Sequence, residues 1–165
     1  MKKIFIVLAV LGVISCGSRN TNKAAENTET TEVIQETKTV KERLALNPDL
    51  GEVMESNYQG TIPAADGPGI KYDLTIWNQQ GADNGVYQLA TTYIEGENGQ
   101  DKTFNSEGLW SAKNFAADST LVVYDFAADS LNDGMSFLFY GDSLKMLDTN
   151  GEIIKSEFNY TLVRQ

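Results

Sequence analysis

The sequence contains no histidine and only one cysteine, Cys16. Histidine is the usual general base near neutral pH and the commonest metal ligand. Without it, and without a free thiol, Ser/His/Asp and Cys/His mechanisms are excluded, as are zinc sites of the Cys and His types. Carboxylate pairs also carry out acid–base catalysis, but no pair is marked out by its spacing. We therefore expect a protein that is not an enzyme and holds neither a cofactor nor a metal ion.

Positive charge is scarce as well. The chain has 13 lysines and arginines against 23 aspartates and glutamates, which gives a formal net charge of -10 at pH 7. Such an acidic chain is a poor partner for nucleic acid and for anionic lipid surfaces. We expect the charge mainly to keep the surface soluble.

The N-terminal residues 1–16 read MKKIFIVLAVLGVISC. A basic start, a short apolar run and a small residue before the cysteine are typical of a secretory signal. The run is too short to cross a bilayer, which needs about 20 apolar residues. Its end resembles the bacterial lipobox, so we expect residues 1–15 to be removed and Cys16 to carry fatty acyl chains such as palmitate. The alternative is an ordinary signal peptide with a chance cysteine.

A lipidated Cys16 would anchor the mature protein in the bacterial cell envelope, because several acyl chains hold stably in a membrane. Gly17 follows the cysteine. In the sorting of Gram-negative lipoproteins, a residue other than aspartate at this place is compatible with the outer membrane. With Cys16 lipidated, the mature chain has no disulfide, and its core alone must stabilise it.

Residues 16–52 are predicted to form the lipidated cysteine and a flexible polar tether. The segment 17–39 is rich in Asn, Thr and Glu and cannot bury enough apolar surface to fold alone. Val33, Val40, Leu44 and Leu46 are spaced for a short helix over 33–46 that ends before Asn47. A plain linker is the alternative.

From residue 53 to residue 165 the composition changes to short apolar runs separated by Gly, Asn and Asp. Apolar and polar residues alternate over 70–76 and 87–93, which is a strand pattern. Runs at 121–126 and 135–140 are apolar enough to be buried strands, and Phe158, Tyr160 and Leu162 alternate near the end. About eight strands with tight turns predict one all-β domain, a small antiparallel up-and-down β-barrel of lipocalin-like form. Asn84-Gly85, Asn98-Gly99 and Asn150-Gly151 are predicted as hairpin turns.

Residues 58–76, YQGTIPAADGPGIKYDLTI, resemble the N-terminal domain of the NlpE family. These bacterial lipoproteins are associated with copper resistance and envelope stress. Their pattern is an aromatic residue, a glycine, a Leu-Pro-Cys-x-x-Cys-x-Gly-Ile segment and a strand with alternating leucine. The matching positions are Tyr58, Gly60, Ile62, Pro63, Asp66, Gly69, Ile70, Leu74 and Ile76. Looser similarity extends the resemblance over about 53–164.

The two cysteines of the family pattern fall on Ala64 and Gly67 here. Paired thiolates bind soft ions such as Cu(I), whereas alanine and glycine offer no ligand atom. We therefore expect no high-affinity copper site. The surrounding segment is either a tight structural loop or a rim loop that meets a ligand or a partner. Its residues are Pro63, Ala64, Ala65, Asp66, Gly67, Pro68 and Gly69.

The resemblance, the lipobox and the tether imply a non-enzymatic envelope lipoprotein that senses envelope or surface stress by contacting another envelope protein. The alternative is a lipocalin-like carrier of a small apolar ligand. In a carrier, aromatic residues would line the cavity, whereas in a sensing lipoprotein the same residues would simply fill the core. The candidates are Tyr72, Tyr87, Tyr93, Trp110, Phe137 and Phe139. A carboxylate-based hydrolase is the least favoured function, because no motif supports it.

Overall fold

The computed structural model describes residues 38–65, 67–127 and 134–165, and within them the chain forms eight strands and one 3-10 helix. In chain order these are η1 (Lys41–Arg43), β1 (Val53–Ile62), β2 (Gly69–Gln79), β3 (Asn84–Glu97), β4 (Gln100–Phe115), β5 (Asp118–Phe126), β6 (Met135–Phe139), β7 (Ser143–Met146) and β8 (Thr161–Arg164). The predicted signal segment, Cys16 and the first part of the predicted tether lie outside the described residues.

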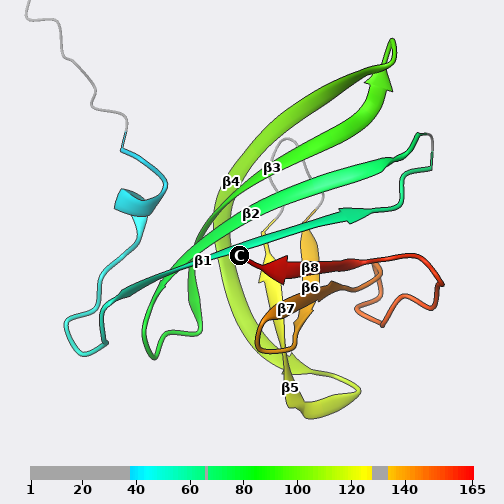
Figure 1. The fold of residues 1–165 in the computed structure, drawn as a ribbon. Helices are drawn as coiled ribbons and strands as arrows, with labels where there is room; N and C mark the ends of the chain where they lie inside the picture. Colours follow the sequence, from blue (N-terminus) through cyan, green and yellow to red (C-terminus); the bar gives the residue numbers. More distant parts are fainter. Residues whose placement is uncertain (1–37, 66, 128–133) are drawn as a thin grey trace, which may run out of the picture. The chain divides into compact units, whose positions relative to one another are not determined.

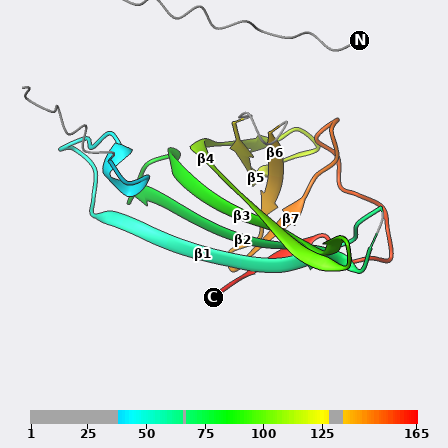
Figure 2. The same ribbon diagram turned by 90° about the horizontal axis from the view of Figure 1, so that it is seen from above.

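Each strand pairs with the next in antiparallel fashion, and β8 pairs with β1, so the sheet closes into a barrel. The predicted all-β up-and-down barrel is therefore confirmed. Figure 1 shows the meander from β1 to β8, and Figure 2 shows β1, β2 and β3 on one side with β5, β6 and β7 on the other. Closure depends on a short contact in which Tyr58 faces Arg164 and Gln59 faces Val163.

The strand register places alternate residues inside the barrel. Tyr58 faces Leu74 on β2, and Leu74 faces Leu89 on β3, so these three side chains point to the same side. All three are buried, and they belong to one core cluster. The buried members of this cluster are Tyr58, Leu74, Ile76, Tyr87, Leu89, Trp110, Phe126, Phe137, Leu144 and Leu162.

One glycine is needed where the barrel closes. A Cβ atom on Gly60 would lie 2.5 Å from the carbonyl oxygen of Thr161 and 2.8 Å from Cδ2 of Leu162. Any larger residue on β1 at this place would push β8 away. The glycine of the family pattern thus has a packing reason here.

Two of the three predicted hairpin turns are confirmed. Asn98 and Gly99 both have positive φ, at 56° and 73°, and join β3 to β4. Gly151 also has positive φ, and it lies in the tight turn that closes the isolated Leu147–Ile153 bridge. The third prediction is wrong, because Asn84-Gly85 begins strand β3 and the chain reverses earlier, around Gly81 with φ 91°.

The segment 38–52, which we call the strap, packs against the outside of the barrel. Val40 is buried with Trp77 and Val86, and Leu44 packs against this small cluster. This part of the predicted tether is therefore attached to the barrel wall. Of the predicted helix over 33–46, the described part contains only the three-residue turn η1. No helix in the described residues is long and apolar enough to cross a membrane.

The alternation predicted near the C-terminus is only partly right. Leu162 is buried inside the barrel, but Phe158 is 71% exposed and precedes the strand. The loop before β8 instead places Ile153 against a second cluster, on the outside of the barrel. Phe115, Val123, Leu138 and Leu147 are the buried members of that cluster.

Candidate functional site

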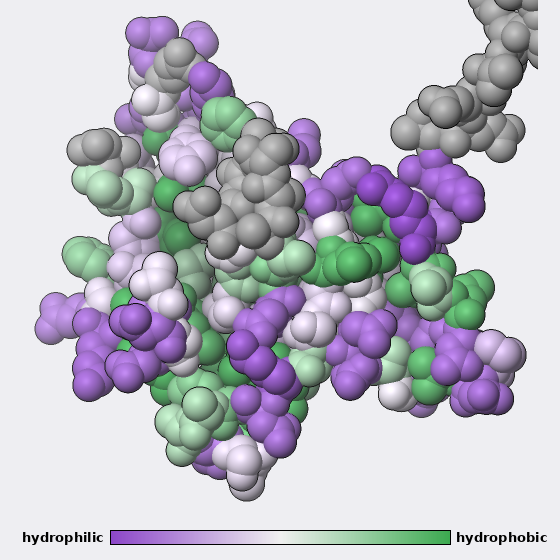
Figure 3. All heavy atoms as spheres, turned by 180° about the vertical axis from the view of Figure 1, so that it is seen from behind, coloured by the Kyte–Doolittle hydropathy of each residue, from purple (hydrophilic) through white to green (hydrophobic). Residues whose placement is uncertain are grey.

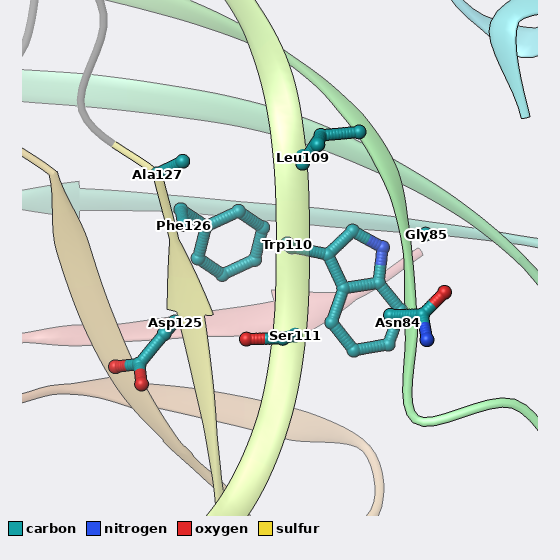
Figure 4. Close-up of a pocket in the computed structure, with 8 residues that line it drawn as sticks. All are labelled: Asn84, Gly85, Leu109, Trp110, Ser111, Asp125, Phe126 and Ala127. Carbon is teal, nitrogen blue, oxygen red and sulfur yellow. The ribbon is translucent and has the colours of Figure 1, made fainter.

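An open pocket of about 390 Å³ lies where β3, β4 and the end of β5 meet. Figure 4 shows its lining, with the Trp110 indole beside the Phe126 ring and the Leu109 side chain directed away from both. The lining residues are Asn84, Gly85, Leu109, Trp110, Ser111, Asp125, Phe126 and Ala127.

Trp110 forms the apolar floor of this pocket. Its ring centroid lies 4.6 Å from that of Tyr124 and 6.4 Å from that of Phe126, the latter in a stacked arrangement. The indole Nε1–H donates to the carbonyl oxygen of Trp77 at 3.4 Å. Because the nitrogen has this partner, the large ring can be buried without an unsatisfied polar atom.

Gly85 makes the position of the Trp110 ring possible. A Cβ atom at Gly85 would lie 2.0 Å from the Trp77 carbonyl oxygen and 2.7 Å from Nε1 of Trp110. The two strands and the indole therefore approach one another more closely than any side chain allows. This close approach explains why a turn-like Asn-Gly pair stands at the start of a strand.

Two polar side chains at the pocket rim, Asp125 and Asn84, have partners within the protein. Asp125 accepts a hydrogen bond from the Ser136 hydroxyl at 2.5 Å and forms an ion pair with Lys113 at 2.5 Å. Asn84 donates to the Asp83 carboxylate at 3.1 Å. With these groups engaged and an aromatic floor, the pocket fits a small apolar group better than a charged one.

The six aromatic residues predicted as cavity lining fall into three environments. Tyr87, Trp110 and Phe137 are buried in the core cluster, and Tyr72 and Phe139 pack against it. Tyr93 is 41% exposed and stands edge-on to Phe104. Of the six, Trp110 lines the open pocket.

The buried tyrosines carry no activated phenol. Burial raises the pKa of Tyr58, Tyr72 and Tyr124, so their hydroxyls are neutral at physiological pH. The Tyr87 hydroxyl donates to the carbonyl oxygen of Ala127 at 3.0 Å. These groups are arranged for packing and hydrogen bonding, not for nucleophilic chemistry.

The predicted loop 63–69 joins β1 to β2. Pro63 and Ala64 are half-buried, whereas Ala65, Gly67 and Pro68 are exposed. Gly69 is buried as the first residue of β2, and Asp66 lies outside the described residues. Gly67 has a φ of 116°, a conformation that residues with a side chain rarely adopt.

The site that holds the strap is not among the predicted sites. Gln79 is a buried polar residue on the outer face of β2. Its Nε2 donates to the carbonyl oxygens of Asn47 at 3.1 Å and Gly51 at 3.0 Å, and its Oε1 accepts from the Asn47 N–H at 2.6 Å. The signal present in the sequence is the apolar pair Ile76-Trp77, which breaks the alternation and indicates burial on both faces of the strand.

A carboxylate strengthens the attachment of the strap. Glu55 accepts hydrogen bonds from the Trp77 indole at 2.7 Å and from the Lys41 ammonium at 3.3 Å. The Trp77 hydrogen bond, followed by that of Lys41, lowers the pKa of Glu55. Arg43 also pairs with Glu107 of β4, and Val40 packs on Val86 of β3, so the strap contacts the four strands β1 to β4.

The closed meander of eight antiparallel strands defines a small up-and-down β-barrel protein. The NlpE N-terminal domain matches residues 58–157, and the chain therefore belongs to the NlpE family. Lipoprotein NlpE of Escherichia coli (strain K12) is 30% identical over 109 residues. That match covers 66% of this chain but 40% of the E. coli protein. No solved structure matches the chain significantly.

Proposed function

We propose that this chain is a lipid-anchored protein of the bacterial envelope, placed in the outer membrane, that senses envelope stress through contact with another envelope protein. The observation that carries the proposal is the match to the NlpE N-terminal domain over 58–157. The lipobox ending at Cys16 supports anchoring, because a cysteine at that place is the acceptor for lipid. Nothing in the described site calls for a reaction.

The packing of the barrel supports recognition by its outer surface. The core cluster contains Tyr87, Phe137 and Leu144 at 1% exposure or less, and these side chains occupy the inner face of the sheet. A barrel filled in this way presents loops, strand edges and exposed side chains to a partner. The position of these features at the membrane then depends on the lipid at Cys16 and on the strap.

The test of this function is a Cys16→Ala variant expressed in cells that carry an envelope-stress reporter. The expected result is loss of the stress response, because the protein is no longer anchored. Ser18→Ala is the matched control, since it changes a neighbouring small residue and keeps the lipobox. Full signalling by Cys16→Ala would refute an anchor-dependent role.

A carrier of a small apolar ligand is the second candidate function, and the open pocket with its Trp110 floor favours it. The pocket predicts saturable binding of a lipophilic fluorophore such as N-phenyl-1-naphthylamine. Leu109→Ser should weaken that binding, because Leu109 is 66% exposed at the rim and can be changed without opening the core. Val163→Ser, at another exposed apolar position, is the control. Absence of saturable binding at micromolar protein would exclude the carrier.

A further inference from the structure

The β3–β4 hairpin extends beyond the end of β5 (Figure 1). The two strands remain paired from Asn84–Ser111 to Glu97–Gln100. On its other side, β4 pairs with β5 from Trp110 onward. Within the described residues, no strand pairs with this second edge of β4 over 100–108. The barrel therefore has a long strand edge next to its closed part.

The direction of the backbone groups along this edge follows from two hydrogen bonds. The Leu109 carbonyl oxygen accepts from the Ala127 N–H on the β5 side, and the Ala112 N–H donates to the Asp83 carbonyl oxygen on the β3 side. Because successive residues of a strand direct their N–H and C=O groups to alternate sides, odd-numbered residues face the open edge. Asn105 lies in the middle of this edge. Among the described residues these groups have no strand partner, and such a row of groups is a template for another strand.

Aromatic surface lies beside the edge, on the inner face of the hairpin. Phe104 is 39% exposed, and its ring stands edge-on to Tyr93 with centroids 5.8 Å apart. The Lys102 ammonium lies 5.4 Å from the Phe104 ring centroid. Figure 3 shows the tip of the hairpin as hydrophilic, with apolar surface below it. An added strand would lie next to Phe104 and would place apolar side chains against its ring.

The other face of the hairpin is acidic. Glu95 and Asp101 lie at the tip, where the Asp101 carboxylate accepts from the Glu95 N–H at 3.0 Å. Glu107 lies further along β4 and is paired with Arg43. Glu95, Asp101 and Glu107 carry three negative charges against the two positive charges of Arg43 and Lys102, which leaves a net negative surface beside the edge and favours a basic partner.

We propose that the edge of β4 over 100–108 binds an extended segment of a partner protein as an added β-strand. Alternate side chains of that segment are apolar and contact Phe104, whose ring is supported by Tyr93, and the others are basic and face Asp101. This inference rests on the proposed function, in which the chain contacts another envelope protein, and it names the surface that makes the contact. A second copy of the chain is the less favoured occupant, because the register that stacks two Phe104 rings brings Asp101 opposite Glu107.

The first test uses the full chain and a labelled peptide of about nine alternating lysine and valine residues, measured by fluorescence anisotropy. The expected result is saturable binding. A peptide with glutamate in place of lysine should bind about tenfold more weakly, as should one with N-methylated backbone amides, because one loses the charge and the other the strand pairing. Equal binding of the N-methylated peptide, or no binding of the lysine peptide, would overturn the proposal.

Asn105→Pro removes an edge N–H without cutting the β3–β4 ladder, because this N–H points away from β3. The variant should reduce binding of the lysine peptide about tenfold, whereas Asn105→Ala should keep it. Phe104→Thr, which retains strand propensity, should also weaken binding and provides a second variant if the proline disturbs the fold. Unchanged binding by both variants would overturn the proposal. Dimerisation of the wild type that Asn105→Pro abolishes would replace the partner protein by a second copy.

The stress reporter separates this proposal from the general function. Asn105→Pro should lose the response and Asn105→Ala should keep it. Full signalling by Asn105→Pro, together with loss of signalling in Cys16→Ala, would refute partner binding at the β4 edge and leave the anchored function intact. Full signalling by Cys16→Ala would refute the anchored function, whatever the edge variants do.

Discussion

Gly85 lies at the tightest approach in the barrel, so Gly85→Ala is the substitution whose cost can be worked out most directly. The new Cβ atom would lie 2.0 Å from the Trp77 carbonyl oxygen, which belongs to the strand paired with β3. That backbone oxygen can move only if the β2–β3 pairing moves with it. The Cβ would also lie 2.7 Å from Nε1 of Trp110, so the indole must leave its hydrogen-bonded position.

Two costs add up in this variant. Overpacking of a closely packed core costs about 1–3 kcal/mol, and loss of the buried indole hydrogen bond costs about 1 kcal/mol more. We expect the free energy of unfolding to fall by about 3 kcal/mol, which lowers the Tm by roughly 10 °C for a domain of this size. Equilibrium unfolding in urea, followed by tryptophan fluorescence, measures the change.

Gly151→Ala is the matched control. Gly151 lies at a turn, with φ 75°, and no atom lies within 4 Å of its Cβ position. Its substitution should cost about 1 kcal/mol, from backbone conformation alone. If Gly85→Ala is no more destabilising than Gly151→Ala, then the close approach of Trp77 and Trp110 does not constrain the barrel, and the explanation given for Asn84-Gly85 fails.

Three further predictions concern the strap and copper binding. Gln79→Leu should release the strap from the barrel, at a local cost of about 2 kcal/mol, because the backbone groups of the strap that Gln79 binds are left unsatisfied. Amide hydrogen exchange over 38–52 should then be faster, and unchanged exchange would contradict the role of Gln79 in holding the strap. Because the pKa of Glu55 is lowered on folding, its contribution to stability is present above its ordinary value of 4.5 and is lost as the pH falls through the lowered value. Trp77 fluorescence should therefore change when acid releases the strap, and this change should be absent in Glu55→Gln. An acid transition that is the same in Glu55→Gln and the wild type would refute the role of Glu55 in holding the strap. Titration of the mature protein with Cu(I) should show no tight binding, because Ala64 and Gly67 offer no ligand atom. A sub-micromolar affinity would contradict this prediction.

The strand content was predictable because most of the barrel obeys a local rule. Residues 70–76 alternate because one face of β2 packs into the core, and a period of two is visible in any short window. The same rule fails at Trp77 and Gln79, whose outward side chains are buried by the strap. That burial depends on residues about 30 positions earlier, and no local pattern encodes it.

The candidate site shows the same division between local and non-local information. Aromatic residues such as Trp110 and Phe137 could be identified as interior, since they lie in alternating strands. Their packing against one another depends on the register of separate hairpins, which a single sequence does not specify. Asn84-Gly85 shows how a local rule can mislead, because its glycine serves a contact with β2 and β4 and not a turn.

The short contact between β1 and β8 also determines the order in which this barrel can assemble. Seven of the eight strand pairings join neighbours along the chain and can form one after another as the chain emerges. The remaining pairing joins Tyr58 to Arg164, across roughly a hundred residues, and this non-local step must come last. Until then the meander is an open sheet with β1 and β8 as exposed edges. A chain shortened before Thr161 would remain in that state, and edge-to-edge aggregation would be its expected fate.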